Sequence, residues 1–147
     1  MLTAVAAEAD AVLAALTATG SLPGEPVRIG PYPACGTSEV TVLAGGIGPA
    51  AAAAATASAL ALQPETSLVL SAGIAGGFAE AGVGVGDLVL ADSSVFADLG
   101  ADSPRGFHSA AELRWAAPTL PPSSAASAVA EALRNAGLPV HQGLVLT

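Results

Sequence analysis

Residues 67–77 read Ser-Leu-Val-Leu-Ser-Ala-Gly-Ile-Ala-Gly-Gly, an uncharged run that passes into a glycine-rich loop. Residues 67–72 have the length and the apolar character of a strand that is covered on both faces, as in a parallel sheet. Ligands of α/β domains bind beyond the carboxyl ends of such strands. The loop 73–77 is therefore a candidate binding loop, because glycines let a ligand approach bare backbone. A turn without a ligand is the structural alternative.

Strands and helices alternate on the N-terminal side of this stretch. Residues 2–5 are typical of the end of a strand, and residues 6–19 predict a helix that stops at Gly20. Residues 40–44 predict a second strand, followed by an alanine-rich helix over residues 50–62. The pattern indicates an α/β fold with a mostly parallel or mixed central sheet flanked by helices.

The C-terminal half continues the alternation. Residues 87–91 predict a buried strand, residues 125–135 a helix and residues 140–147 a final strand. Serine, alanine and proline dominate the segment before the helix, which predicts loop structure up to Ser124. Residues 20–36 contain four prolines and predict loop or edge structure instead of a central strand.

The length of 147 residues indicates one domain over residues 1–147. We expect that domain to be partial, with the C-terminal part of the fold missing, because no helix follows the final strand. Residues 40–64 carry no charge but are rich in glycine and alanine, which insert weakly into lipid, so we expect no membrane span. The N-terminus has no basic residue and is interrupted by acids, which argues against a signal peptide.

The charges exclude several classes of function. Four arginines and no lysine stand against 12 acidic residues, a net charge of −8. A P-loop and a Schiff-base enzyme each need a lysine, and nucleic-acid binding needs a basic face. The single Cys35 allows no intrachain disulfide, and with only His108 and His141 it offers no zinc-ligand spacing. We expect no metal and a reducing, cytoplasmic location; both histidines are better explained as structural than as catalytic.

Residues 46–51 match the loose G-x-G-x-x-A form of the dinucleotide fingerprint. The acid that should close the next strand and bind the ribose is missing, because that strand ends at Ser71-Ala72. We therefore interpret the turn as a close-approach site for another polar ligand at a helix N-terminus, and we expect no dinucleotide cofactor.

Glu8 is the candidate catalytic acid or base. It lies just after the first strand, where a carboxylate could activate water as a general base. The alternative is an ordinary first-turn acid that favours the positive end of the helix dipole. Asp92, Asp98 and Asp102 lie in a stretch where solvated loop acids are expected, and Cys35 has no basic neighbour to activate it.

Four motifs carry a resemblance to a known superfamily. They are Ala4-Val5-Ala6-Ala7-Glu8, Gly45-Gly46-Ile47-Gly48, Ser71-Ala72-Gly73-Ile74-Ala75-Gly76-Gly77-Phe78 and Val85-Gly86-Asp87-Leu88-Val89. In this order and spacing they resemble the nucleoside phosphorylase and nucleosidase superfamily. Residues 97–107, Ala-Asp-Leu-Gly-Ala-Asp-Ser-Pro-Arg-Gly-Phe, are similar to the futalosine hydrolase branch, which acts in menaquinone biosynthesis.

The resemblance implies hydrolysis of an N-glycosidic bond, which releases hypoxanthine from futalosine without a cofactor or metal. By similarity, Glu8 activates water, Gly46 and Ile47 line the substrate site without making room for phosphate, and Ala75 with Gly76 lies against the nucleoside. The family's leaving-group aspartate and its ribose-binding glutamate, which follows a methionine, lie beyond the segment that resembles residues 140–147. The resemblance also implies a homo-oligomer.

Two alternatives stay open: a methylthioadenosine/adenosylhomocysteine nucleosidase, and a non-catalytic remnant that binds nucleosides. A phosphorylase is disfavoured because no arginine lies beside the glycine loops.

Overall fold

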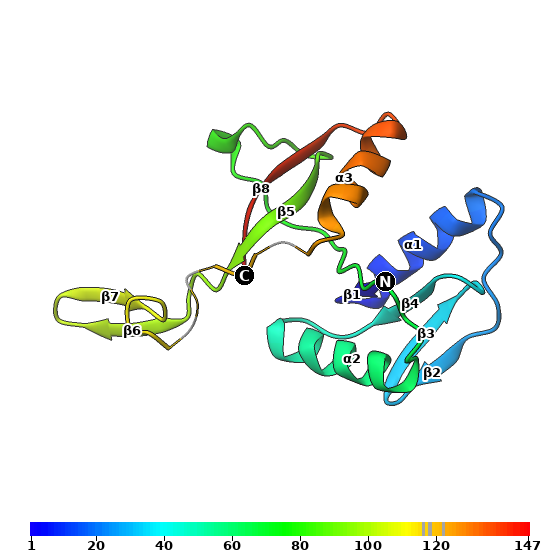
Figure 1. Ribbon diagram of the computed structural model, residues 1–147, viewed down its shortest axis with the longest axis horizontal. Helices are drawn as coiled ribbons and strands as arrows, with labels where there is room; N and C mark the ends of the chain where they lie inside the picture. The colour runs from blue at the N-terminus through cyan, green and yellow to red at the C-terminus, as the bar shows by residue number, and fades with distance from the viewer. Residues whose placement is uncertain (116, 118, 122) are drawn as a thin grey trace. The chain divides into compact units, whose positions relative to one another are not determined.

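The computed structural model describes residues 1–115, 117, 119–121 and 123–147. The chain consists of two compact units, residues 1–75 and residues 76–147, and each has its own strands and helices (Figure 1). Whether residues 1–147 form one domain stays a prediction.

The first unit is built on a four-stranded mixed sheet. Its strands lie in the order β1 (Leu2–Thr3), β4 (Thr41–Ala44), β3 (Tyr32–Gly36) and β2 (Val27–Ile29). Strand β1 runs parallel to β4, whereas β4 with β3 and β3 with β2 are antiparallel pairs. The predicted α/β class with a mostly parallel or mixed sheet is confirmed, and the sheet of this unit is mixed.

Two helices pack on this sheet, α1 (Ala6–Ala18) and α2 (Pro49–Leu62), and each lies within one residue of its predicted bounds. The core of the unit joins Leu2 and Leu43, which face each other on β1 and β4, to Ala55 of α2. Val42 points to the opposite face, because side chains alternate along a strand, and it is almost fully buried. Helix α1 contacts β1 and β4, and Figure 1 shows α1 and α2 on opposite sides of these strands.

The predicted strand at residues 67–72 is wrong in its extent. Only Ser71 forms a bridge, parallel to Leu2 of β1. The N–H of Leu2 donates to the carbonyl of Leu70 at 2.7 Å, and the N–H of Ala72 donates to the carbonyl of Leu2 at 2.9 Å. Strand β1 has two residues, and only one of them can direct its backbone groups toward this neighbour. Leu68 and Val69 are exposed and not covered as predicted.

The prediction that residues 20–36 contain no central strand is also wrong. Strand β3 lies inside the sheet, between β2 and β4. It tolerates Pro33 because its ladder with β4 starts only at Ala34, so that the missing N–H of proline falls outside that ladder. Strand β2 lies at the edge, as expected.

The second unit contains the parallel pair β5 (Leu88–Val95) and β8 (Val140–Leu146), contacted by helix α3 (Ala126–Asn135). These three elements confirm the predicted strands and helix, although β5 runs further than expected. A 3-10 turn, η1 (Ala79–Ala81), precedes β5. The prediction that this strand is covered on both faces is wrong, because Leu88 and Val89 are exposed. Among the described helices, α3 is the one that packs on strands β5 and β8.

An antiparallel hairpin, β6 (Gly100–Ser103) and β7 (Gly106–Ser109), stands where the sequence predicts a loop. Asp92 lies in β5 and Asp102 in β6, so neither is a loop residue as predicted, although both are exposed to solvent. The rest of the predicted loop includes residues 116, 118 and 122, which lie outside the described residues.

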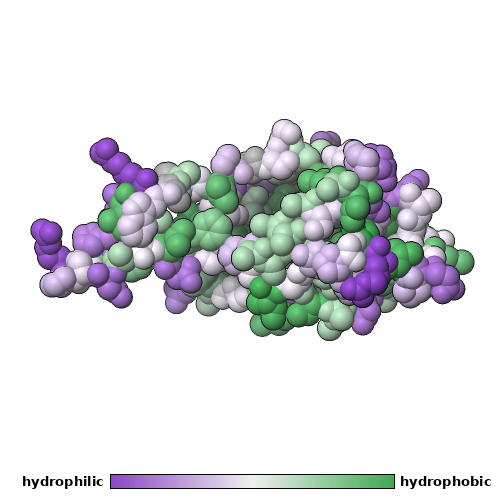
Figure 2. Space-filling view, turned by 90° about the horizontal axis from the view of Figure 1, so that it is seen from below, coloured by the Kyte–Doolittle hydropathy of each residue, from purple (hydrophilic) through white to green (hydrophobic). Residues whose placement is uncertain are grey.

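Hydrophobic side chains reach the surface, and the face in Figure 2 carries several patches of them. Ile47 and Ile74 are 81% and 92% exposed, and Leu144 and Leu146 of β8 are also exposed. In the part of the chain that the structure describes, no helix has both the length and the apolar character needed to cross a lipid bilayer.

Candidate active site

The carboxyl ends of three parallel segments meet at one edge of the first unit. Strand β1 lies between β4 and Ser71, and both neighbours run parallel to it. The loops that follow these segments therefore begin at the same edge. The N–H groups of Gly45 and Gly46 donate to the carbonyls of Thr3 and Ala4, each at 2.9 Å, which attaches the turn after β4 to the end of β1.

Glu8 lies at this edge, in the first turn of α1, and its carboxylate is held by three backbone amides. Oε1 accepts a hydrogen bond from the N–H of Ile74 at 2.9 Å. Oε2 accepts from the N–H of Ala4 at 2.9 Å and from the N–H of Val5 at 3.3 Å. The carboxylate thereby joins the first turn of α1 to the loop after Ser71.

Glu8 has the capping position expected of an ordinary first-turn acid, and its catalytic role stays a prediction. Val5 precedes α1, and its N–H is one of the amides that a helix leaves unpaired. Glu8 satisfies it from the third helical position, as the acid of a capping box does. A capping acid has no need to contact residue 74, however. The bond to Ile74 therefore shows that this carboxylate also attaches the loop after Ser71 to α1.

The amide donors lower the pKa of Glu8 below the ordinary value of a glutamate. The N–H of Ile74 is the largest cause, followed by the N–H groups of Ala4 and Val5, while burial acts in the opposite direction. Hydrogen bonds to the charged form stabilise it. Glu8 is therefore ionised at neutral pH and acts as an acceptor, not as an acid.

Three of the four other predicted site residues lie in the loops of the first unit that begin at the same edge as Glu8. Gly46, at φ +100°, and Ile47 belong to the turn after β4, and Ala75 follows Ile74 in the loop after Ser71. Gly76 is the first residue of the second unit. The structure thus places Gly46, Ile47 and Ala75 at the strand edge that carries Glu8, while their binding roles stay a prediction.

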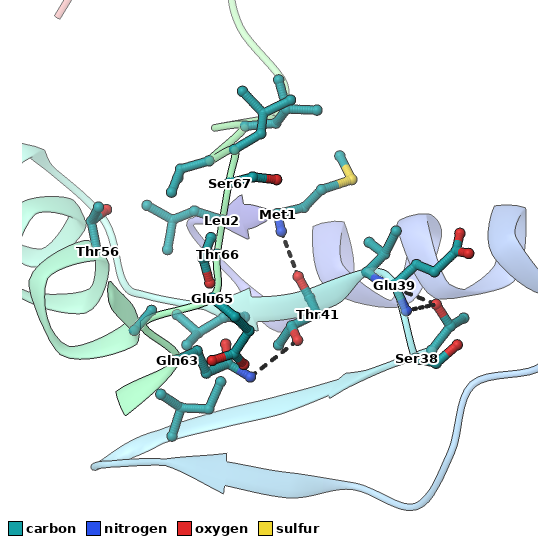
Figure 3. A pocket seen from close by; sticks show the side chains of 18 residues that line it. Met1, Leu2, Ser38, Glu39, Thr41, Thr56, Gln63, Glu65, Thr66 and Ser67 are labelled. Atoms are coloured by element: carbon teal, nitrogen blue, oxygen red, sulfur yellow. Dashed lines mark hydrogen bonds between the residues drawn. The ribbon is translucent and has the colours of Figure 1, made fainter. Parts of the chain in front are cut away.

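A cavity of about 510 Å³ lies at the other end of β1 (Figure 3). Its lining includes Met1 and Thr41, and the N-terminal ammonium of Met1 donates to the carbonyl of Thr41. Nε2 of Gln63 donates to Oγ1 of Thr41 at 3.3 Å. Because these residues precede or begin the strands, the cavity lies at their amino ends. It does not include Glu8, and the carboxyl-end loops are the better candidate site.

Comparison with known proteins identifies the family of the chain. Residues 2–147 match the family described as the phosphorylase superfamily. The chain belongs to this superfamily. It is 48% identical over 107 residues to a futalosine hydrolase of Acidothermus cellulolyticus, covering 73% of this chain and 41% of that protein. It is 44% identical over 137 residues to a futalosine hydrolase of Streptomyces coelicolor, covering 88% of this chain and 56% of that protein. The chain thus spans about half the length of these two relatives.

Solved structures of the superfamily share the fold. A methylthioadenosine/adenosylhomocysteine nucleosidase of Neisseria meningitidis, in complex with methylthio-immucillin-A, superposes with a TM-score of 0.71 at 22% identity, over 99% of this chain and 62% of that one. A futalosine hydrolase mutant of Helicobacter pylori superposes with a TM-score of 0.71 at 21% identity, over 99% of this chain and 65% of that one. At these identities the likeness shows the fold alone.

The other polar side chains that the sequence singles out contact residues of their own unit. His141 Nε2 lies 3.2 Å from Asp87 Oδ2, at the start of the β5 and β8 pair. His108 Nε2 lies 3.0 Å from Ser103 Oγ across the β6–β7 hairpin. Cys35 donates to the carbonyl of Gly24. Among the described residues, no three histidine, cysteine or acidic side chains are grouped so that they could hold a metal ion.

One backbone donor to Glu8, the N–H of Ile74, is the part of the site that the sequence does not reveal. Ala4 and Val5 lie within four residues of Glu8, so a capping interaction could have been foreseen from spacing. Ile74 is 66 residues away, and only the parallel bridge between Leu2 and Ser71 brings its loop to the first turn of α1.

Proposed function

We propose that this chain carries the water-activating part of a purine nucleosidase of the futalosine hydrolase type. The reaction hydrolyses the N-glycosidic bond of futalosine and gives dehypoxanthine futalosine and hypoxanthine. The observation that carries the proposal is the Glu8 carboxylate, ionised and fixed by backbone amides at the carboxyl ends of β1 and its parallel neighbours. The two futalosine hydrolase relatives, at 44% and 48% identity, support the choice of substrate.

The hydrogen bonds of Glu8 support a position for the nucleophilic water. An ionised carboxylate has about four acceptor positions, two on each oxygen. Oε2 uses two of them on Ala4 and Val5, and Oε1 uses one on Ile74. Among the described residues, no donor occupies the fourth position, which is on Oε1. We assign the attacking water to it, with one proton directed at this oxygen.

The low pKa of Glu8 suits a transition state in which the sugar carries positive charge. As the bond to the purine breaks, the sugar becomes oxocarbenium-like, and an ionised carboxylate stabilises that charge more in the transition state than in the ground state. Glu8 then accepts a proton from the water while the water oxygen bonds to the anomeric carbon. Because the cation is a strong electrophile, orientation of the water matters more than the basicity of the carboxylate.

The arginines support hydrolysis over phosphorolysis. A phosphate nucleophile is bound best by bidentate arginine contacts. Arg28 is the sole basic side chain among residues 1–75, and it donates to the carbonyl of Pro31 at the turn between β2 and β3. In the sequence, Arg105, Arg114 and Arg134 are not adjacent to the glycine loops at residues 45–48 and 73–77. Water is therefore the proposed nucleophile.

The proposal also covers the location of the protein in the cell and its oligomeric state. We propose a cytoplasmic enzyme, because a chain with one cysteine forms no intrachain disulfide and suits a reducing compartment. We propose a homo-oligomer, because the apolar side chains on β8 offer a surface for a second copy. Size-exclusion chromatography with light scattering measures the oligomeric state, and a monomer at micromolar concentration would contradict this part.

The test uses the chain together with any sequence that its gene encodes beyond Thr147, because both relatives are longer than this chain. Hypoxanthine release from futalosine is measured by chromatography, with and without phosphate, beside adenine release from methylthioadenosine. We expect phosphate-independent hypoxanthine release that exceeds adenine release. A preference for methylthioadenosine would move the assignment to that nucleosidase. Tight nucleoside binding without turnover would instead favour the non-catalytic alternative.

A further inference from the structure

Gly73 lies directly against the carboxylate of Glu8. A Cβ atom built on Gly73 would stand 2.7 Å from Oε1, 3.1 Å from Cδ and 3.3 Å from Oε2 of Glu8. All three distances are shorter than an ordinary van der Waals contact. The carboxylate therefore occupies the volume that any other residue at position 73 would fill with its own side chain.

The backbone of Gly73 does not require a glycine. Its φ lies outside the left-handed range in which several other glycines of the chain, such as Gly46 and Gly48, are found. Alanine can adopt such a conformation at little cost. The steric requirement at this position comes from Glu8 and not from the main chain.

The following residue explains the tight approach. Ile74 donates its N–H to Oε1 at 2.9 Å, and this bond brings the carboxylate against the main chain at residue 73. A side chain there would act on the free end of a glutamate, which moves far more easily than backbone. The displaced carboxylate would give up the bond to Ile74 and keep those to Ala4 and Val5, which approach Oε2 from α1.

We propose that Gly73 is a positioning residue for the Glu8 carboxylate. The absence of a side chain at position 73 holds Oε1 on the Ile74 amide and leaves its remaining acceptor position directed at the attacking water. This inference rests on the proposed function, in which Glu8 activates water. It adds a sequence requirement, a residue without a side chain immediately before Ile74, that acts through the position of the Glu8 carboxylate.

The first test is Gly73→Ala in the same full-length protein, with Gly143→Ala as the matched control. A Cβ at Gly143, in β8, would meet no atom within 4 Å, and its φ is also outside the left-handed range. We expect kcat for hypoxanthine release to fall about 100-fold in Gly73→Ala, since a displacement of about 1 Å of a catalytic group has an effect of that size. KM should change little, the melting temperature should stay within a few degrees, and the control should keep its turnover.

A second readout separates this inference from the proposed function. The amide proton of Ile74 is followed by NMR against pH in the wild type and in Gly73→Ala. The N–H of Ile74 is the largest cause of the lowered Glu8 pKa, so loss of the Ile74 bond should raise that pKa and remove the pH-dependent shift of the Ile74 amide. If this happens in a protein that does not hydrolyse futalosine, the positioning role stands and the proposed function fails. An unchanged Ile74 titration in the variant overturns the inference.

A double-mutant cycle covers the case of a variant that folds poorly. In the Glu8→Ala background the carboxylate is gone, so Gly73→Ala should have no further effect on the free energy of unfolding. If Gly73→Ala unfolds and the double variant folds, the clash with Glu8 is confirmed. If the two changes destabilise additively, or if neither variant folds, position 73 has a role of its own in the backbone and the inference is wrong.

Discussion

Oε1 of Glu8 and the backbone N–H of Ile74 lie 2.9 Å apart, and this bond joins residues that are 66 positions apart in the sequence. It connects the start of α1 to the loop after Ser71, two segments that strand β1 also connects through its bridge to Ser71. Because the donors to Glu8 are all main-chain groups, its position depends on backbone geometry and not on the identity of neighbouring polar side chains.

Replacement of Glu8 by glutamine should abolish hydrolysis and preserve substrate binding. Glutamine has nearly the same shape but no charge, so it can neither stabilise an oxocarbenium-like sugar nor accept a proton from water. General-base catalysis typically contributes about 10² to 10⁴ in rate, and we expect kcat to fall by that factor. Chromatographic assay of hypoxanthine gives kcat, and calorimetry gives the affinity for futalosine.

Asp10→Asn is the matched control, because Asp10 is an exposed acid on the same helix. It should leave kcat within about twofold of the wild type, as expected for a surface change away from the site. Turnover of the Glu8→Gln protein at a near-normal rate would rule out the general-base role.

Stability should decrease in acid in a way that depends on Glu8. The folded-state pKa of Glu8 is lowered by the amides of Ile74, Ala4 and Val5, whereas in the unfolded chain a glutamate titrates near its ordinary value of about 4.3. Its contribution is therefore fully present above about pH 4.3, and it is lost as pH falls through the lower folded-state pKa. The difference in free energy of unfolding between the wild type and Glu8→Gln should shrink as pH falls from 7 to 3.

Glu112 supplies the control for this measurement. Its pKa is also lowered, first by the backbone N–H of Ser109 and then by the hydroxyl of Ser109. Part of the acid sensitivity should therefore remain in Glu8→Gln and disappear only when Glu112→Gln is added. Urea unfolding curves at several pH values measure the wild type, Glu8→Gln and the double variant. A difference between wild type and Glu8→Gln that does not vary with pH would contradict the lowered pKa.

The sequence predicts local structure better than strand extent. The bounds of α1 and α2 follow from local signals, such as Gly20 after the first helix and Pro49 at the start of the second. The segment at residues 67–72 has the composition of a strand but forms a single bridge, because strand length depends on how much of a partner is available. The β6–β7 hairpin escapes prediction because its strands are rich in residues such as glycine, serine and aspartate, which have low strand propensity.

The candidate site shows the same limit. The position of Glu8 after the first strand and the glycine loops after two other strand segments are visible in the sequence, and the sheet edge on which they meet follows from parallel pairing. The contact that orients the carboxylate depends on how closely the loop after Ser71 approaches α1. That distance is set by packing over 66 residues and has no local pattern.

His141 should be dispensable for activity. It pairs with Asp87 at 3.2 Å, and both side chains are more than a third exposed. Exposed pairs of this kind contribute about 0.2 to 1 kcal/mol. We expect His141→Ala to lower the free energy of unfolding by that amount and to leave kcat unchanged. A loss of tenfold or more in kcat, with the protein still folded, would show that the structural interpretation of this histidine is wrong.

The turn after β4 should respond to alanine in two different ways. A Cβ on Gly45 would lie 2.7 Å from both the Cβ of Ala55 and Cδ1 of Leu2, inside the core between α2 and β1. Overpacking of this kind typically costs about 1 to 3 kcal/mol, and the backbone shift that relieves it would carry the turn and Ile47 away from the end of β1. Gly45→Ala should therefore lose both stability and turnover.

Gly48 is the matched comparison, because a Cβ there meets no atom within 4 Å, while its φ of +92° and ψ of 162° belong to a region that only glycine adopts readily. Such backbone strain costs about 1 to 3 kcal/mol, similar to the overpacking at Gly45. It arises at the N-cap residue of α2, however, and moves no core side chain. Gly48→Ala should therefore lose stability while the melting transition stays as cooperative as in the wild type. Thermal unfolding of the two variants, followed by near- and far-ultraviolet circular dichroism, measures this. A broadened transition in Gly48→Ala, or an unchanged melting temperature in Gly45→Ala, would contradict these predictions.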